Sequence, residues 1–180
     1  FCTDHHDEWK SSSVQLTCRI DQKKSVSGKP GAWPYMDFLL TGGEGCSKNG
    51  VIHPHCPGQT DDEYRTTFAL WSISQSPMIV ATDVRNFTGA MSETILNKDI
   101  IKLHQSTETP PGGHIKYWEC SELLSCEVWG RKINANGTSW MVALVNRGKK
   151  SHKITVKWSD LGLSNDKNGN IYDVWGQATI

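Results

Sequence analysis

The chain has 180 residues, enough for one ordinary domain or for one domain and part of another. Its 19 lysines and arginines balance 19 aspartates and glutamates, and a formal net charge of zero argues against a nucleic-acid partner. Hydrophobic residues make up 37% of the chain and charged residues 21%, which is typical of a globular protein. No apolar run reaches the ~20 residues of a membrane-spanning helix, so no membrane partner is expected.

Alternating helices and strands are predicted in the first half of the chain. A short helix is expected over residues 7–16. The sequence from Thr60 to Glu63 is a capping box, and apolar residues at helical spacing then continue to Pro77. Residues 78–81 form an apolar run typical of a buried parallel strand, and residues 91–103 return to helical spacing. This order of elements is the repeating unit of a parallel α/β fold.

Short antiparallel strands are predicted in the second half. The segment 107–113 is rich in proline and glycine and predicts a linker, which divides the chain into an α/β part at 1–108 and an all-β part at 113–180. Asn136-Gly137 predicts a type I′ hairpin turn, because that turn needs positive φ at both positions. The predicted strands, in chain order, are residues 140–145, 154–158 and 172–175.

Six cysteines and two N-glycosylation sequons, at Asn86 and Asn136, indicate an oxidising compartment. We therefore expect a secreted or a lysosomal or vacuolar protein. Cys46–Cys56 and Cys120–Cys126 would each close a short loop, and we predict both pairs as disulfides.

A Cys2–Cys18 bond is not expected. A helix over residues 7–16 would hold these two cysteines beyond the ~7 Å limit between bonded Cα atoms. Cys2 is instead expected to be free or bonded to a cysteine upstream of this chain.

Two polar clusters admit more than one interpretation. Asp4-His5-His6-Asp7 has the residue types of metal ligands, but adjacent residues of a strand point to opposite faces. A solvated loop or a single catalytic carboxylate therefore competes with a metal site there. The sequence from His53 to Cys56, together with Cys46, also has metal-ligand types, and in an oxidising compartment the disulfide is the favoured interpretation.

Asp37 lies in an apolar stretch between Trp33 and Phe38. A carboxylate in such surroundings is costly unless it is partnered or used, so Asp37 is either functional or structurally hydrogen-bonded. Asp83 and Arg85 follow the apolar run at 78–81, and we expect them to pair with each other.

The stretch from Pro57 to Asn86 resembles the α-galactosidases of glycoside hydrolase family 27. In that family a helix written roughly T-x-x-E-Y-R-x-x-F-x-L-W leads to S-P-L-x-x-x-x-D-[VL]-R. Further similarities follow in the family's order, and the match covers almost the whole chain. They are Asn97–Ile101, Val128-Trp129, Val145–Arg147, Trp158–Gly162 and Asp173–Trp175.

The resemblance implies a (β/α)8 barrel followed by an antiparallel β-sandwich domain. On that template the chain holds the C-terminal quarter of the barrel, from near the end of strand six, and then the β-sandwich. The family hydrolyses glycosides with retention, using two aspartates. Its nucleophile lies on strand four and has no counterpart in this chain.

The family's acid/base aspartate opens a pattern like D-x-D-D-x-W, and the resemblance assigns this role to Asp4. Asp7 and Trp9 match the fourth and sixth positions, whereas His6 replaces the second aspartate.

The family's W-N-D-P-D-M segment contacts the galactose pocket and corresponds to residues 33–38 here. The resemblance therefore implies that Trp33, Asp37 and Phe38 contact the substrate, although the residues between them differ from the family pattern.

The implied activity is removal of terminal α-linked galactose from oligosaccharides and glycoconjugates, without cofactor or metal. The full-length protein is able to form a homodimer in this interpretation. α-N-acetylgalactosaminidase and β-L-arabinopyranosidase share these motifs, because the family's residues around the sugar 2-position lie largely upstream. A non-catalytic, carbohydrate-associated fragment is the remaining alternative.

Overall fold

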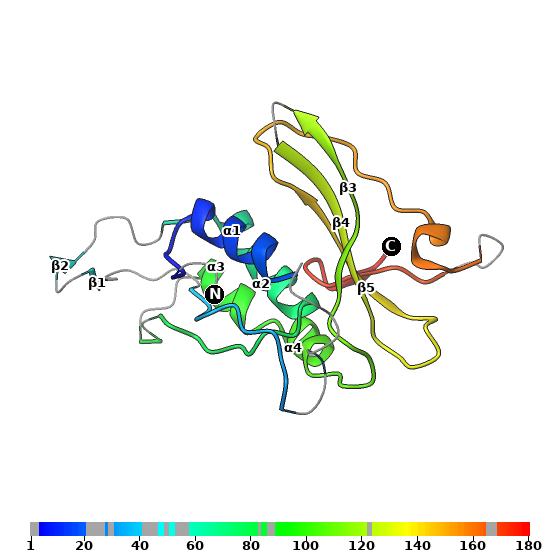
Figure 1. Ribbon diagram of the computed structural model, residues 1–180, viewed down its shortest axis with the longest axis horizontal. Coiled ribbons are helices and arrows are strands. Elements are labelled where there is room, and N and C mark those ends of the chain that lie inside the picture. The colour runs from blue at the N-terminus through cyan, green and yellow to red at the C-terminus, as the bar shows by residue number, and fades with distance from the viewer. Residues whose placement is uncertain are drawn as a thin grey trace.

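The structure is a computed structural model that describes residues 4–20, 28, 31–40, 47–48, 51–52, 58–82, 84–85, 89–121, 124–164 and 169–180. Helices gather on one side of the molecule and a three-stranded sheet on the other, and the C-terminal segment returns from beyond the sheet toward the helices, where the Val174 carbonyl accepts from the Asn97 side chain (Figure 1). The helices are α1 (Trp9–Ile20), α2 (Asp61–Ile73), α3 (Gly89–Ile95), α4 (Lys98–His104) and the 3₁₀ helix η1 (Trp158–Leu161). The strands are β1 (Ser47–Lys48), β2 (Val51–Ile52), β3 (Gly113–Ser121), β4 (Leu124–Lys132), β5 (Trp140–Asn146), β6 (Tyr172–Asp173) and β7 (Ala178–Thr179).

Helix α2 begins at the predicted capping box. The Thr60 hydroxyl accepts from the Glu63 amide at 3.3 Å, and the Thr60 amide donates to the Glu63 carboxylate at 2.8 Å. Three acidic residues lie in the first turn, where their negative charges interact favourably with the positive end of the helix dipole. The helix ends at Ile73, four residues before Pro77.

The remaining helix predictions need two adjustments. Helix α1 exists but starts at Trp9 rather than at residue 7, and it continues to Ile20. The expected helix over 91–103 is two helices, because Asn97 caps α4 with its side chain, which accepts from the Ile100 amide at 3.0 Å.

The apolar run at 78–81 pairs in parallel, as predicted, but it is not buried. Leu39 and Val80 form a parallel bridge, in which the Leu39 amide donates to the Ile79 carbonyl at 2.8 Å. Ile79 is 45% exposed and Val80 39% exposed. The prediction of burial was wrong because no layer within the described ranges covers these side chains.

Strands β3, β4 and β5 form an antiparallel sheet in that order, and the predicted Cys120–Cys126 disulfide joins β3 to β4. The hairpin between β4 and β5 was correctly predicted, but its type I′ turn was not. The Gly137 amide donates to the Asn134 carbonyl at 3.1 Å, and of the two predicted positions only Gly137 has positive φ. The Asn134 side chain accepts from the amides of Thr138 and Ser139, which holds a longer loop.

The predicted strand at 154–158 is absent from the ladders that the structure describes. Exposure still alternates along this segment, but no described strand pairs with its backbone, and Trp158 begins η1 instead. The last predicted strand is the short β6, which pairs with β7.

One hydrophobic core joins the helices to the sheet. Phe68 and Trp71 of α2 pack in the same buried cluster as Leu16 of α1 and Trp129 of β4. The sheet therefore packs against α1 and α2, the helices nearest to the loops of the candidate site. No helix in the described part of the chain is both long enough and apolar enough to span a membrane.

Candidate active site

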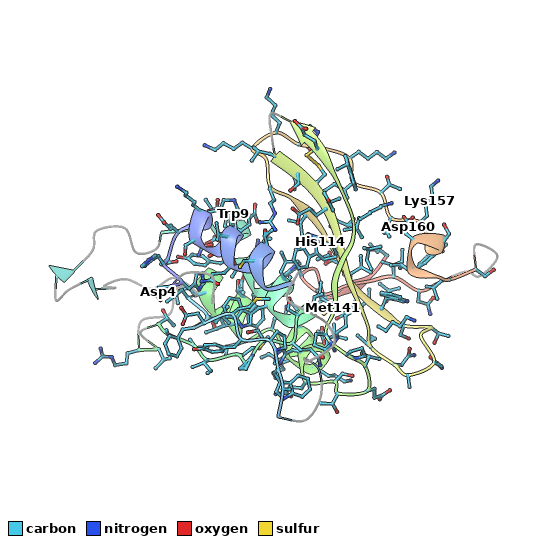
Figure 2. All side chains as sticks on the ribbon, in the orientation of Figure 1. Asp4, Trp9, His114, Met141, Lys157 and Asp160 are labelled. Atoms are coloured by element: carbon cyan, nitrogen blue, oxygen red, sulfur yellow. A yellow bond between two sulfur atoms is a disulfide. The ribbon has the colours of Figure 1, made fainter. Side chains whose placement is uncertain are left out.

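Asp4 has an exposed side chain in the loop that precedes α1 (Figure 2). The loop is tied to the helix that follows, because the His6 amide donates to the Ser11 hydroxyl at 2.9 Å. An exposed carboxylate at the rim of the helical layer is open to a substrate. This geometry is compatible with the acid/base role that the resemblance assigns to Asp4.

Asp37 lies directly against the Asp4 loop. Its carboxylate accepts from the His5 amide at 2.9 Å through Oδ2 and from the Phe38 amide at 2.9 Å through Oδ1. Its φ of 75° is in the left-handed region, which costs a residue other than glycine roughly 1–3 kcal/mol. The two loops that carry Asp4 and Asp37 are thus joined by a direct hydrogen bond.

Trp33 and Phe38 flank Asp37 with partly exposed rings, at 37% and 46% exposure. Between them Met36 is fully buried, as is Leu39 beyond. Met36 and Leu39 therefore anchor the segment, and aromatic rings and one partly exposed carboxylate remain at the surface. Flat apolar rings beside a carboxylate suit the faces and hydroxyls of a sugar.

His5 is the residue of this loop that sequence reasoning did not single out. Its ring nitrogens contact the Phe38 carbonyl and the Ser12 hydroxyl, each at 2.8 Å, and the ring stacks on Trp71 at 5.7 Å. Both nitrogens are therefore engaged with protein. Within the described ranges, no three His, Cys, Asp or Glu side chains are placed to hold a metal ion.

Asp7 has a structural role. Its carboxylate accepts from the Tyr64 hydroxyl at 2.7 and 2.9 Å, and from the Gln59 side chain at 3.2 Å. Burial and the bonded carboxylate raise the pKa of the Tyr64 phenol, which therefore remains the proton donor. Asp7 thus ties the candidate site loop to the start of α2, a contact between residues 57 positions apart that no local pattern signals.

A buried ion pair fastens the sheet to α1. Glu127 of β4 accepts from Arg147 Nε at 2.6 Å, and these two side chains are only 6% and 7% exposed. Arg147 also donates to Ser13 of α1, and its guanidinium lies 5.9 Å from the centre of the Trp9 ring. Burial alone would raise the pKa of Glu127, but hydrogen bonds from His114, Arg147 and Ser125 outweigh it and hold that pKa well below its usual range.

We expect Glu127→Ala to lower the free energy of unfolding of the full-length protein by about 3–5 kcal/mol, because it leaves the buried Arg147 without a counter-charge. A thermal or urea unfolding curve measures this. The matched control is Glu93→Ala, which removes an exposed ion pair with Arg65 at 3.7 Å, and its cost should stay below about 1 kcal/mol.

The Glu127 contribution also depends on pH. Because folding lowers the pKa of Glu127, its contribution is complete above the ordinary glutamate pKa and is lost as the pH falls toward the lowered value. Glu127→Gln should therefore flatten the acid side of the stability curve. An unchanged acid side, or a Glu127→Ala cost equal to that of Glu93→Ala, would contradict this assignment.

Several predictions concern residues outside the described ranges. They are the Cys46–Cys56 disulfide, the state of Cys2, the His53–Cys56 segment, the Asp83–Arg85 pair and the sequon at Asn86. Cys18, which the structure describes, is disulfide-bonded.

Comparison with known proteins decides the family. Residues 2–106, more than half of the chain, match the family model described as alpha galactosidase A, and residues 125–180 match the alpha galactosidase C-terminal beta sandwich domain. The chain belongs to glycoside hydrolase family 27. The expected fold class, part of a (β/α)8 barrel followed by an antiparallel β domain, is thereby confirmed.

Relatives in family 27 are considerably longer than this chain. α-Galactosidase 2 of Arabidopsis thaliana is 27% identical over 176 residues, which are 98% of this chain and 39% of that protein. The α-galactosidase of Coffea arabica is 30% identical over 122 residues, 68% of this chain and 30% of that protein. The chain thus spans well under half of the curated relatives that it matches.

Solved structures of family 27 share the fold. A β-L-arabinopyranosidase from Geobacillus stearothermophilus aligns with a TM-score of 0.78 at 22% identity, over 98% of this chain and 38% of the other. α-Galactosidase I from Mortierella vinacea aligns with a TM-score of 0.66 at 24% identity, over 96% of this chain and 36% of the other. At these identities the likeness concerns the fold alone.

Proposed function

We propose that this chain is part of a retaining α-galactosidase that removes terminal α-linked galactose from oligosaccharides and glycoconjugates. The observation that carries the proposal is the 2.9 Å hydrogen bond from the His5 amide to the Asp37 carboxylate. This hydrogen bond joins two segments that match separate motifs of the family. The bonded residues are 32 positions apart in the sequence, and they lie together at one edge of the helical layer. Active sites of (β/α)8 barrels gather at such a rim, where strands end.

Each residue of the rim has a role in this proposal. Asp4 protonates the leaving oxygen in the first step and activates water in the second. Asp37 binds sugar hydroxyls, and the rings of Trp33 and Phe38 contact the sugar. The nucleophile belongs to a part of the barrel that this chain does not supply.

The test is an assay of the full-length protein on nitrophenyl α-galactoside, its N-acetylgalactosaminide analogue and nitrophenyl β-L-arabinopyranoside. We expect the galactoside to have the highest kcat/KM. β-L-Arabinopyranosidase and α-N-acetylgalactosaminidase, which share the family motifs, are the alternative activities. Preference for the arabinoside or the N-acetyl sugar would replace the α-galactosidase proposal, and no turnover of any of the three would remove it.

We propose a secretory route to the outside of the cell or to the lysosome or vacuole, with an N-glycan at Asn136. The Cys120–Cys126 bond supports an oxidising compartment. Asn136 lies exposed in the loop between β4 and β5, and the Thr138 hydroxyl donates to its amide oxygen at 2.8 Å.

We expect an N-glycosidase to lower the mass of the peptide that contains this loop, in protein made by a secreting eukaryotic host. Asn136→Gln and Thr138→Ala should each abolish that loss, whereas Thr138→Ser, which keeps the sequon, should retain it. Mass spectrometry of the loop peptide reads the result. An unmodified Asn136 in secreted protein would contradict the assignment.

A further inference from the structure

His5 stands between the two loops of the proposed site. Its residue neighbour Asp4 carries the proposed acid/base carboxylate, yet the His5 side chain is itself buried, at 9% exposure. The Asp4 side chain is exposed and the His5 side chain is buried, so the two lie on opposite sides of one loop. The contacts that fix His5 therefore also fix the backbone that carries Asp4.

Two hydrogen bonds join residue 5 to the Asp37–Phe38 segment. The His5 amide donates to the Asp37 carboxylate, and ring Nδ1 lies 2.8 Å from the Phe38 carbonyl oxygen. A carbonyl oxygen only accepts, so Nδ1 carries the proton. The first bond could be made by any residue except proline, but the second needs a side-chain donor at this position.

The other side of the ring is bonded to α1. Nε2 lies 2.8 Å from the hydroxyl of Ser12, which is fully buried, and with the proton on Nδ1 the hydroxyl is the donor. Trp71 of α2 stacks on the ring at 5.7 Å with planes 27° apart. One side chain thus contacts the Asp37 segment, α1 and α2 at once.

The neutral ring suits this set of partners. Burial lowers the pKa of His5, against opposing effects of the Phe38 carbonyl and of the charges of Asp37 and Asp7, while His6 acts in the same direction as burial. A neutral imidazole has one donor and one acceptor, and the Phe38 carbonyl and the Ser12 hydroxyl use both.

We propose that His5 is a positioning residue, which sets the distance between the Asp4 acid/base and the Asp37–Phe38 wall through its Nδ1–H bond to the Phe38 carbonyl. The inference rests on the proposed function. If the bond is lost, the backbone bond to Asp37 remains, but Asp4 can shift against the bound sugar. Misplacement of a catalytic group by about 1 Å can cost roughly 10²-fold in rate.

The two nitrogens can be tested separately in the full-length protein. The side-chain amide of Asn reaches about as far as Nδ1, and that of Gln about as far as Nε2. His5→Asn therefore keeps a donor for the Phe38 carbonyl, whereas His5→Gln and His5→Leu lose it. Ser12→Ala removes only the bond on the Nε2 side.

The readout is the dependence of kcat/KM on the leaving group, measured with raffinose and with dinitrophenyl α-galactoside. We expect His5→Gln and His5→Leu to lower kcat/KM on raffinose about 10- to 100-fold, and on the activated substrate less than about 3-fold, since that leaving group needs little proton donation. His5→Asn and Ser12→Ala should stay within about 3-fold of the original protein on both substrates.

The matched control for loss of a buried histidine is His104→Leu. The His104 ring also bonds a backbone carbonyl, that of Ser76 at 2.8 Å, but it belongs to α4, which carries none of the proposed site residues. His104→Leu should lower the melting temperature without changing the leaving-group dependence. All variants are assayed below their melting temperatures.

Asp4→Asn, run in the same assay, separates the two possible failures. If Asp4→Asn shows no leaving-group dependence, the proposed function of Asp4 has failed. Suppose that Asp4→Asn shows the leaving-group dependence, but that His5→Gln and His5→Leu lower kcat/KM equally on both substrates or lower only the melting temperature. His5 is then structural, and the inference is overturned. Failure of His5→Asn to rescue the raffinose activity would overturn it as well.

Discussion

In the full-length protein, Asp4→Asn is expected to lower kcat/KM on raffinose by about 10²–10⁴-fold, the range that general acid catalysis supplies. Asparagine keeps the size and polarity of the side chain but cannot transfer a proton to the leaving oxygen. A dinitrophenolate leaves without that proton, so kcat/KM on dinitrophenyl α-galactoside should fall far less. Steady-state kinetics on the two substrates measure the difference.

A second property of Asp4→Asn follows from the base role. Hydrolysis of the glycosyl-enzyme needs a base to activate water, whereas azide attacks without one, so azide should restore turnover of the activated substrate. The matched control is Asp62→Asn on α2. The Asp62 side chain is 93% exposed, and this variant should leave kcat/KM on both substrates unchanged. Equal activity of Asp4→Asn and the original protein on raffinose would contradict the assignment of Asp4 as the acid/base.

The 180-residue chain by itself is expected to hydrolyse nothing. A retaining mechanism needs a second carboxylate ~5–5.5 Å from the acid/base, on the opposite face of the sugar. Asp37 does not suit this role, because both of its oxygens accept backbone amides beside Asp4. Asp83, the other candidate at a strand end, lies outside the described residues, and on the family template neither aspartate belongs to strand four.

The isolated chain should also associate. Phe38 at 46%, Ile79 at 45% and Val80 at 39% exposure are apolar side chains near the Leu39–Val80 bridge, and within the described ranges no further strand pairs with the two segments of this bridge. Light scattering of the purified chain should show particles larger than a monomer. The control is the full-length protein, which supplies the part of the barrel that this chain lacks.

The decisive measurement is turnover by the purified chain on nitrophenyl α-galactoside, with the full-length protein as the positive control. Turnover that disappears in Asp37→Ala or Asp83→Ala would show that the nucleophile is in this chain and that its assignment to strand four is wrong.

Local signals in the sequence were sufficient for several elements. The Thr60–Glu63 capping box places the start of α2 because both of its hydrogen bonds lie within one turn. The Cys120–Cys126 bond and strand β5 also follow from patterns a few residues long. The segment 107–113, rich in proline and glycine, together with the hydrophobic periodicity on either side, divided the chain into an α/β part and an all-β part, and the family motifs nominated Asp4 and Asp37.

Local patterns were insufficient where a distant partner decides the outcome. Residues 78–81 have the composition of a buried strand, yet burial depends on layers that other segments must supply. Residues 154–158 alternate as a strand does, yet a ladder needs a neighbouring backbone. Asn97 divides the helical segment 91–103, and its side chain also donates to the Val174 carbonyl, 77 residues away.

By itself, the sequence determined where α2 begins, the α/β and all-β character of the two parts of the chain and the residue types near the site. Only the tertiary structure decided which distant groups these side chains contact. His5 meets Asp37 across 32 residues, Asp7 meets Tyr64 across 57, and Arg147 meets Ser13 across 134. The physical reason is that buried polar groups must find partners wherever the chain brings them, and such pairings leave no periodic signal in the sequence.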